Sequence, residues 1–332
     1  MEKKLRVLVI GVGSIGERHV RTFLATQRVS VSICETTDAK RNEVAARYPV
    51  QAAYPDLDAA LGAEHDVAVI ATPAHLHVAI AERLAAQGIH LLIEKPLSTS
   101  LEGVDRLKEE VARRGVVVGI AYVWRCFSPL LEMRDGIVSG RFGKPLEIVV
   151  QTGQHFPTFR PAYREIYYSD RKTGGGAIQD LLTHFMNVGE WLVGPVERLV
   201  CDASHQMLEG VEVEDTVHVM TRHGGVMGCY SVNQYQAPNE STITVVCEEG
   251  TVRAEPHERR WRWKLGPKSD WEERQLDVLE RDVMFIAQAD AFLDAVAGKR
   301  SPPCTLDEGL QTLRVNLAAL ESVEKSRWIS IG

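Results

Sequence analysis

Hydrophobic and polar positions in the first third of the chain follow two alternating patterns. Continuous runs of aliphatic residues, rich in Val and Ile, are typical of strands that are buried on both faces of a parallel sheet. Between these runs, apolar residues recur every three or four positions, which predicts helices. The runs lie at 5–10, 29–35, 66–73, 89–98 and 116–124, and helices are predicted after the first run and at 75–88. This order predicts a doubly wound α/β domain with a parallel sheet.

The pattern changes after about residue 123. Apolar and polar residues then alternate one by one in several runs, which are joined by short polar or glycine turns, as in an antiparallel meander. These runs lie at 145–153, 215–223, 225–235, 241–256 and 259–265, and helices are predicted at 127–143, 285–298 and 307–326. We therefore expect two domains, residues 1–123 and residues 124–332.

A glycine-rich turn, GVGSIG, separates the first predicted strand from the first predicted helix. A G-x-G-x-x-G spacing between a strand and a helix is typical of dinucleotide binding. Gly11 permits a tight turn, Gly13 lets the backbone approach a pyrophosphate, and Gly16 lets the helix pack closely on the strand. The helix that begins near Ser14 and Ile15 offers free N–H groups to the phosphates.

Glu35 ends the second predicted strand. An acid at this place accepts hydrogen bonds from the ribose hydroxyls and repels a 2′-phosphate, which favours NAD over NADP. Lys40 and Arg41 lie close in the sequence and soften this preference, so NADP stays possible. A solvated strand end is the alternative interpretation of Glu35.

Further candidate residues follow the later strands of the first domain. Ligands of doubly wound sheets bind at the carboxyl ends of the strands, so these residues belong to the candidate cofactor site. They are Thr72, Pro73, Glu94, Lys95 and Arg125.

His75 and His77 form an H-x-H pair at the start of a predicted helix. Zinc binds to such pairs when further ligands follow, but no Cys or acid follows here at ligand spacing. We therefore expect no metal, and expect His77 to contact the cofactor or to cap the helix.

The strand predicted at 89–98 ends in the sequence Glu94-Lys95-Pro96. Proline fixes φ and stiffens the turn, and Glu94 can hold the Lys95 ammonium in place. A lysine in a dry cleft near other cations loses basicity, so Lys95 can act as a general acid or base near neutral pH. An exposed lysine in an ordinary turn is the alternative.

Composition narrows the classes of partner. The chain has 332 residues and a formal net charge of −7, which argues against nucleic acid as the main partner. The basic and aromatic run RRWRWKL is more simply interpreted as a strand. The six cysteines form no C-x-x-C pair, and no apolar run is long enough to span a bilayer or to act as a signal peptide. We expect a cytoplasmic protein without a membrane partner.

The motifs GVGSIG, ATPAHLH, IEKP and GGGAIQDLLTH occur in an order and at spacings similar to those of the glucose-fructose oxidoreductase, inositol dehydrogenase and rhizopine-catabolism (Gfo/Idh/MocA) family. The resemblance covers nearly the whole chain. It implies an N-terminal Rossmann domain and a C-terminal domain with a large, mostly antiparallel sheet, through which the chain forms a homodimer or homotetramer. It also implies an NAD- or NADP-dependent oxidoreductase acting on secondary alcohols of sugars, inositols and related compounds.

The same resemblance implies a catalytic set. The lysine of the family falls on Lys95, and its paired acid and histidine fall on Asp180 and His184. Pro96 permits the cis Lys-Pro bond that family members can hold. Residues four apart share one helical face, so Asp180 and His184 are expected to project together. If the preceding glycines bring this helix to the nicotinamide, both meet Lys95 there, and either Lys95 or His184 takes the hydroxyl proton.

The segment 155–173 precedes these glycines and is rich in Arg, Tyr and Phe. We expect a loop over the substrate mouth, although a subunit contact fits equally well. Its candidate substrate residues are Arg160, Tyr163, Arg164 and Tyr168. Two other functions stay open: a glycosidase that recycles NAD, and a dinucleotide-binding sensor, which the intact catalytic set disfavours.

Overall fold

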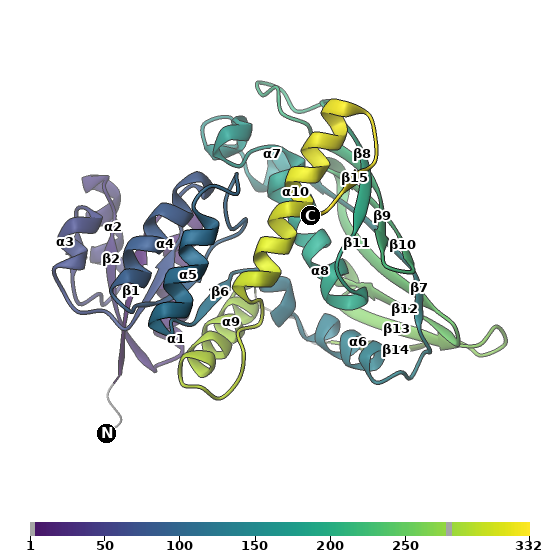
Figure 1. Ribbon diagram of the computed structural model, residues 1–332, viewed down its shortest axis with the longest axis horizontal. Helices are drawn as coiled ribbons and strands as arrows, with labels where there is room; N and C mark the ends of the chain where they lie inside the picture. Colours follow the sequence, from purple (N-terminus) through teal and green to yellow (C-terminus); the bar gives the residue numbers. More distant parts are fainter. Residues whose placement is uncertain (1–3, 277–280) are drawn as a thin grey trace. The chain divides into compact units, whose positions relative to one another are not determined.

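The computed structural model describes residues 4–276 and 281–332, and its contacts divide the chain into two units (Figure 1). Unit 1 comprises Met1–Cys126 and Glu280–Gly309, and unit 2 comprises Phe127–Leu279 and Leu310–Gly332. The sequence pattern predicted a single boundary near residue 123, whereas the chain passes between the units three times. The reason is that helix α9 (Arg281–Val296) buries apolar side chains in the core of unit 1.

Unit 1 contains a six-stranded sheet in the order β3-β2-β1-β4-β5-β6. All five pairs of neighbouring strands are parallel, which confirms the predicted doubly wound sheet. The strands are β1 (Leu5–Ile10), β2 (Val29–Cys34), β3 (Ala53–Tyr54), β4 (Val67–Ile70), β5 (His90–Ile93) and β6 (Val118–Ile120). The two-residue strand β3 was not predicted, because it is too short to carry a pattern.

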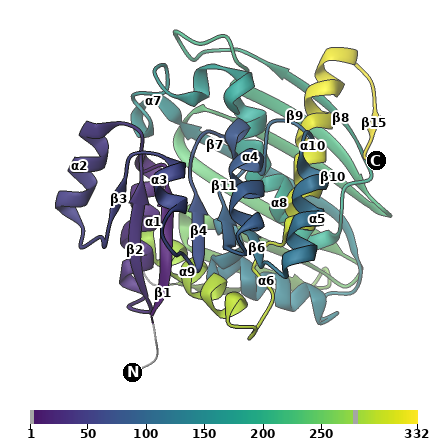
Figure 2. The same cartoon turned by 60° about the vertical axis from the view of Figure 1, so that its left-hand side comes forward.

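Helices cover both faces of this sheet, with α1 beside α9 and α4 beside α5 (Figures 1 and 2). The remaining helices are short or lie near the edge strand. The bounds are α1 (Ser14–Ala25), α2 (Asp38–Arg47), α3 (Leu57–Leu61), η1 (Ala74–Leu76), α4 (His77–Ala86), α5 (Val104–Arg114) and η2 (Val123–Cys126).

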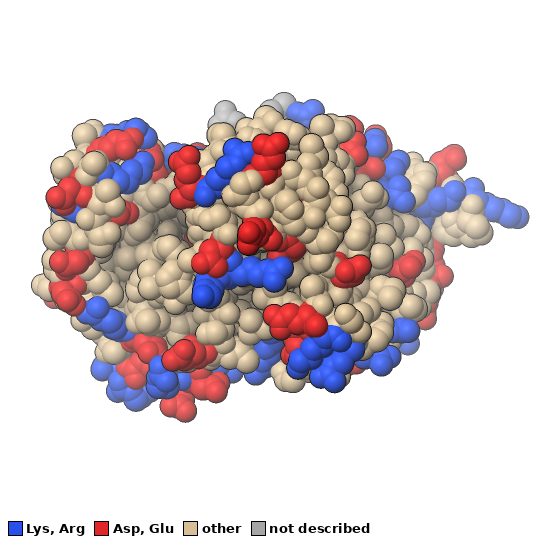
Figure 3. All heavy atoms as spheres, turned by 90° about the horizontal axis from the view of Figure 1, so that it is seen from above, with Lys and Arg blue, Asp and Glu red and all other residues tan. Residues whose placement is uncertain are grey.

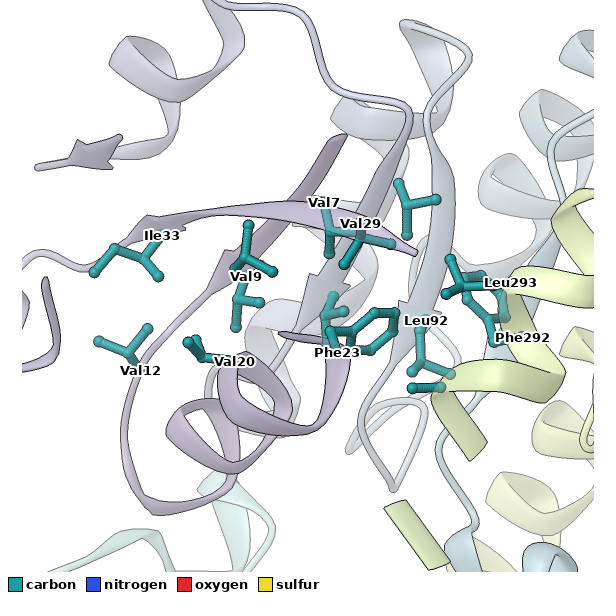
Figure 4. Packing of buried hydrophobic residues seen from close by; sticks show 14 of the residues in the cluster. Val7, Val9, Val12, Val20, Phe23, Val29, Ile33, Leu92, Phe292 and Leu293 are labelled. Carbon is teal, nitrogen blue, oxygen red and sulfur yellow. The ribbon is translucent and has the colours of Figure 1, made fainter. Parts of the chain in front are cut away.

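The core between the sheet and helices α1 and α9 is aliphatic and aromatic (Figure 4). Val7 and Val9 of β1 pack in one cluster with Phe23 of α1 and with Phe292 and Leu293 of α9. All five side chains are almost completely buried. Each such burial stabilises the fold by about 1.5–3 kcal/mol, which is why α9 belongs to unit 1 although it follows the second sheet in the sequence.

Unit 2 contains a nine-stranded sheet in the order β14-β13-β12-β11-β7-β10-β9-β8-β15. Its neighbouring strands are antiparallel, except that β7 and β10 run parallel. The mostly antiparallel sheet is therefore confirmed, but the simple meander is wrong, because β7 inserts between β10 and β11. The bounds are β7 (Pro145–His155), β8 (Arg198–Ser204), β9 (Thr216–His223), β10 (Val226–Asn233), β11 (Tyr235–Cys247), β12 (Gly250–Glu255), β13 (Arg260–Leu265), β14 (Glu272–Gln275) and β15 (Ile329–Ser330).

Helices pack on one face of this sheet. Gly189 of α8 contacts Tyr230 of β10 so closely that a Cβ at Gly189 would lie 2.0 Å from the tyrosine hydroxyl. The other face exposes large apolar side chains, with Met220 54% and Met227 51% accessible. The helical segments are α6 (Ser128–Val138), α7 (Phe156–Phe159), η3 (Tyr167–Ser169), η4 (Arg171–Thr173), η5 (Ile178–Leu182), α8 (Thr183–Val193), η6 (Pro256–Glu258) and α10 (Leu306–Lys325), which begins in unit 1.

Charged residues of both signs are interspersed on the surface that Figure 3 presents. All of the basic run RRWRWKL except its first residue, Arg259, forms strand β13, in which Arg260 pairs with Glu255 and Glu273. Its interpretation as a strand is therefore confirmed. Among the described residues, no helix has both the length and the apolar character needed to cross a bilayer.

Candidate active site

The glycine-rich turn joins β1 to α1 as predicted. Gly11 has a φ of +78°, and a Cβ there would lie 2.9 Å from the Ala71 carbonyl oxygen. A Cβ at Gly16 would lie only 1.8 Å from the Gly11 carbonyl oxygen, whereas a Cβ at Gly13 would meet no described atom within 4 Å. Packing within the protein thus requires Gly11 and Gly16, and Gly13 borders open space that suits a pyrophosphate.

The start of α1 offers polar groups to such a ligand. The first i→i−4 hydrogen bond of the helix runs from the Glu17 N–H to the Gly13 carbonyl oxygen at 2.8 Å. The N–H groups of Ser14, Ile15 and Gly16 therefore precede the helical ladder. Together with the helix dipole they suit an anion, so this turn fits a dinucleotide.

Glu35 follows β2 and borders the glycine turn. Its carboxylate accepts hydrogen bonds from the backbone N–H groups of Val12 at 3.0 Å and Thr37 at 2.9 Å. These two bonds fix the orientation of the carboxylate beside the turn. An oriented acid at this place suits the hydroxyls of a ribose.

The two basic residues near Glu35 both have acidic partners. Lys40 Nζ lies 3.1 Å from Glu17 and 3.3 Å from Glu43. Arg41 donates to the carbonyl oxygen of Glu35 at 2.8 Å and pairs with Asp38. These pairs compete with any 2′-phosphate for the two cations.

His77 connects the turns that follow β4 and β5. Its Nε2 lies 2.8 Å from the carbonyl oxygen of Thr72, and its Nδ1 lies 3.0 Å from that of Pro96. The ring is only 1% exposed, and burial lowers its pKa although the carbonyl groups oppose this. Both ring nitrogens therefore face the protein, which differs from the predicted contact with the cofactor. Nor does His77 cap its helix, since α4 has no side-chain cap.

The other residues of the turn after β4 differ in their exposure. Pro73 and His75 are exposed, so the two histidines of the H-x-H pair face different surroundings. The Thr72 hydroxyl is buried and has no hydrogen-bond partner within residues 4–276 and 281–332, so it fits a ligand group. Over the same residues, no cluster of three metal-binding side chains is found.

Lys95 is partly buried and follows β5 in a turn whose Lys95–Pro96 peptide is cis. Glu94 is 6% exposed, and its Oε1 lies 2.8 Å from His19 Nε2. Its Oε2 accepts a hydrogen bond of 3.0 Å from the Lys95 N–H. Burial raises the pKa of Glu94, but the bond from His19 and the nearby charges outweigh it, so that its pKa lies below the ordinary value. Glu94 is therefore ionised and buried, and it accepts a hydrogen bond from the backbone of Lys95.

Arg125 lies in η2 and is 3% exposed. It donates to the Pro303 carbonyl oxygen at 3.1 Å and pairs with Glu308 at the start of α10. Burial raises the pKa of Glu308, but the positive charge of Arg125 outweighs it and lowers that pKa. The structure thus places this predicted cofactor residue in an ion pair within unit 1.

In unit 2, Asp180 and His184 lie on consecutive helical segments. The sequence predicted one regular α-helix, but Asp180 lies in η5, which is π-helical, and His184 in α8. Such wider turns occur frequently at functional sites. Asp180 is 8% exposed, and its carboxylate accepts hydrogen bonds from the Tyr167 hydroxyl at 2.7 Å and from Gln234 Nε2 at 3.4 Å.

Tyr167 and Gln234 are residues that the sequence did not identify. Gln234 is completely buried and also accepts a hydrogen bond from the Tyr168 hydroxyl. Tyr167 lies in a segment without periodicity, and Gln234 follows β10, far from Asp180 in the sequence. Only the tertiary structure brings these side chains to one carboxylate.

The glycines before η5 pack against the protein itself. A Cβ at Gly175 would lie 2.2 Å from the Tyr168 carbonyl oxygen, and a Cβ at Gly176 would lie 2.4 Å from Glu214 Oε1. Glu214 is buried, accepts a hydrogen bond from the Ile178 N–H at 3.1 Å and pairs with Arg171. The glycines therefore allow the start of η5 to pack closely against the buried carboxylate of Glu214.

The predicted substrate loop contains a small core of its own. Tyr163 and Tyr168 are 1% and 0% exposed and pack with Phe156, whose ring centroid lies 4.5 Å from that of Tyr168. Tyr163 donates to the Glu209 carbonyl oxygen at 2.7 Å, and so does Arg164. Both tyrosines thus differ from the expected lining of a substrate mouth, because their rings supply the buried surface that orders this segment. Arg160 is partly exposed.

Two family models match the chain. A model of an oxidoreductase family with an NAD-binding Rossmann fold matches residues 5–122, and the GFO/IDH/MocA C-terminal domain matches residues 130–253. The chain belongs to the Gfo/Idh/MocA family. It is an oxidoreductase with an NAD-binding Rossmann domain, and the predicted family, fold class and cofactor are confirmed.

Known proteins resemble the chain to different extents. It is 30% identical over 190 residues to UDP-N-acetylglucosamine 3-dehydrogenase of Acidithiobacillus ferrooxidans, a match that spans 57% of the chain and 55% of that protein. It is 26% identical over 328 residues to rhizopine catabolism protein MocA of Rhizobium meliloti, spanning 97% and 96%. Levoglucosan dehydrogenase in complex with NADH and levoglucosan shares the fold, with a TM-score of 0.91, 21% identity and coverage of 99% and 100%.

Proposed function

We propose that this chain transfers a hydride between NAD and a secondary alcohol or ketone of a sugar, an inositol or a sugar-acid derivative. The observation that carries the proposal is the buried carboxylate of Asp180, which Tyr167 and Gln234 hold four residues before the partly exposed His184. The open space at Gly13 in unit 1 supports the binding of NAD. Relatives named for UDP-N-acetylglucosamine and levoglucosan support a sugar-like substrate.

The proposal assigns the catalytic roles to Lys95, Asp180 and His184. NAD, when bound, supplies the hydride acceptor at its nicotinamide ring. During oxidation, His184 or Lys95 takes the hydroxyl proton while the carbinol carbon loses its hydrogen with both bonding electrons, and a carbonyl forms. Asp180 orients the imidazole and the substrate, and the cation that does not take the proton stabilises the developing negative charge on oxygen.

The proposal also assigns the cofactor contacts. The N–H groups of Ser14, Ile15 and Gly16 bind the pyrophosphate, and Glu35 binds the ribose that distinguishes NAD from NADP. The Thr72 hydroxyl contacts the cofactor beside Pro73. His77, Glu94 and Arg125 support the cofactor site without contacting the cofactor, because their polar atoms bind to other groups of the protein.

A screen of sugars, inositols and sugar acids with NAD and with NADP tests the function. We expect at least one polyol to produce a steady increase in the ultraviolet absorbance of reduced nicotinamide. Substrate turnover without a net absorbance change would indicate a glycosidase that recycles NAD. Binding of NAD without any turnover across the screen would indicate a sensor, and either result would contradict the proposal.

Variants then test the catalytic set. Lys95→Ala and His184→Ala should each lower kcat by about 10²–10⁴-fold, the usual loss for an acid or base, without loss of NAD binding. The double variant should lose much less than the product of the two single losses, because the two groups serve one step. Lys108→Ala is the control, since Lys108 lies in α5 and pairs with Asp307. Near-normal turnover of Lys95→Ala would exclude Lys95 from the chemistry.

The proposal includes a homodimer or homotetramer that forms through the sheet of unit 2. Cys229 lies between Met220 and Val149 on adjacent strands of that sheet, and all three side chains are exposed. An apolar row of this kind suits contact with a second copy of the chain. The cytoplasmic location stays a prediction from the sequence.

A further inference from the structure

His19 is a buried histidine that has no role in the proposed reaction so far. It lies on α1, three residues after Gly16, and is 1% exposed. Its ring packs near Phe23, at 6.3 Å between centroids, and near Phe285, at 6.0 Å. Burial of an imidazole among aromatic rings costs free energy unless a hydrogen bond compensates. The compensating bond is the one of 2.8 Å between Nε2 and Glu94 Oε1.

The direction of this hydrogen bond follows from the chemistry of its two partners. An ionised carboxylate only accepts hydrogen bonds, so His19 Nε2 carries the proton. In the part of the chain that the structure describes, His19 Nδ1 is buried and has no partner. The hydrogen bond to Glu94 therefore uses the Nε2–H of His19.

Glu94 connects His19 to the turn that contains Lys95, because its two oxygens accept one hydrogen bond from each. While Oε1 accepts from His19, Oε2 accepts the Lys95 N–H at 3.0 Å. On the far side of Lys95, the Pro96 carbonyl oxygen lies 3.0 Å from His77 Nδ1. The backbone around Lys95 is thus held before and after its Cα, by groups that are at most 6% exposed.

We infer that His19 is a positioning residue, which acts through Glu94 to hold the Lys95 backbone where its amine can reach the substrate. The inference rests on the proposed function of Lys95. Helix α1 carries both the glycine turn and His19. The candidate pyrophosphate site and the candidate catalytic lysine are therefore joined by one helix and two hydrogen bonds, so that the helix which binds the cofactor also sets the position of the amine.

Kinetics of matched variants test this role. His19→Leu removes the donor to Glu94 and should lower kcat about 10–100-fold, the usual effect of a small misplacement of a catalytic group, with the Kd for NADH changed by less than about threefold. His19→Gln keeps an N–H donor and should recover most of kcat. Phe23→Leu is the control, because it loosens the packing around the same ring without touching Glu94.

The control separates positioning from stability. If Phe23→Leu lowers kcat as much as His19→Leu at an equal loss of thermal midpoint, the inference is overturned. It is also overturned if His19→Gln is no more active than His19→Leu. Should His19→Leu not fold, Glu94→Gln takes its place, since His19 and the Lys95 N–H bind different oxygens of Glu94 and a glutamine replaces one of these oxygens by a donor NH2 group. That variant is expected to lose kcat in the same range.

A measurement without substrate keeps the inference separate from the proposed function. Imidazole nitrogen NMR of the whole chain should show a proton on His19 Nε2, with a resonance that moves in Glu94→Gln. A bare Nε2, or a resonance that does not change in Glu94→Gln, would overturn the inference. If the wild-type chain oxidises no polyol, the proposed function fails, whereas this experiment still decides whether Glu94 holds His19.

Discussion

The Tyr167 hydroxyl donates a hydrogen bond of 2.7 Å to Oδ1 of Asp180. Tyr167 is 36% exposed and Asp180 only 8%, so the phenol links the surface of unit 2 to a buried carboxylate. Since the proposed mechanism uses this carboxylate to orient the substrate and His184, a residue that was not recognised in the sequence becomes part of the candidate site.

Tyr167→Phe removes this donor and should lower kcat by about tenfold or more, the usual range for a hydrogen bond to a charged group. Tyr163→Phe is the matched control, because it removes a hydroxyl that donates to a backbone carbonyl in the nearby core. The control should cost about 0.5–1.5 kcal/mol of stability and leave kcat nearly unchanged. Steady-state kinetics and urea unfolding of both variants check this, and an equal loss of kcat would contradict it.

Gly13→Ala and Gly16→Ala should separate cofactor binding from folding. A Cβ at Gly13 meets open space, so Gly13→Ala should fold with less than about 1 kcal/mol of change in stability, while its methyl group obstructs the pyrophosphate and weakens NAD binding. Gly16→Ala places a Cβ on the Gly11 carbonyl oxygen and should cost about 1–3 kcal/mol or more. Calorimetry with and without NAD measures both effects. A Gly13→Ala protein that binds NAD normally would exclude the proposed phosphate position.

Glu35→Ala should weaken NAD more than NADP, because only NAD presents the free 2′-hydroxyl that the carboxylate accepts. The loss in NAD affinity should be about tenfold or more, as expected for a hydrogen bond to a charged group. Asp38→Ala is the control, since Asp38 is a neighbouring acid that pairs with Arg41. Titration with both cofactors tests this, and equal losses for the two would remove Glu35 from the ribose.

Asp215 should make the stability of the chain depend on acid pH. Its carboxylate is buried and accepts hydrogen bonds from the backbone N–H groups of Gln206, Met207 and Leu208. Burial raises its pKa, but these bonds outweigh burial and hold the pKa below the ordinary value. A depressed folded-state pKa means that the stabilisation is present above the unfolded pKa and is lost as the pH falls through it toward the folded value.

Urea unfolding across this range tests the prediction. Stability should decline below about pH 4, and Asp215→Asn should lower it at neutral pH by about 1–3 kcal/mol and flatten the acid decline. Asp202→Asn is the control, because Asp202 is exposed on β8. An acid decline that is unchanged in Asp215→Asn would assign it to other groups.

Met220→Glu should shift the chain toward smaller assemblies. The substitution places a charge in the exposed apolar row of Met220, Cys229 and Val149, where a second copy would have to desolvate it. Light scattering after gel filtration should show a lower mass than the wild type, whereas Val138→Glu, at an exposed site on α6, should not change the mass. An unchanged mass of Met220→Glu would place the interface elsewhere.

Local patterns in the sequence predicted most of the long strands and helices. Apolar runs predicted β1, β2, β4 and β5, and alternation predicted β7, β9 and β10. The pattern did not predict the parallel pairing of β7 with β10, because alternation specifies which face is buried and not which strand lies alongside. Nor did it place α9 in unit 1, since an amphipathic helix carries no record of the sheet that it covers.

The candidate site divides in the same way. The sequence by itself determined Gly11, Gly13 and Gly16 between a strand and a helix, Glu35 after β2, and Lys95 in its turn, because each depends on neighbours along the chain. Only the tertiary structure decided that Tyr163 and Tyr168 are core residues. It also decided that Tyr167 and Gln234 bind the carboxylate of Asp180. Likewise, only the tertiary structure connects His19 to Lys95 by way of Glu94. These contacts join residues far apart in the sequence, and the free energy that selects them comes from burial and hydrogen bonding, which no local pattern records.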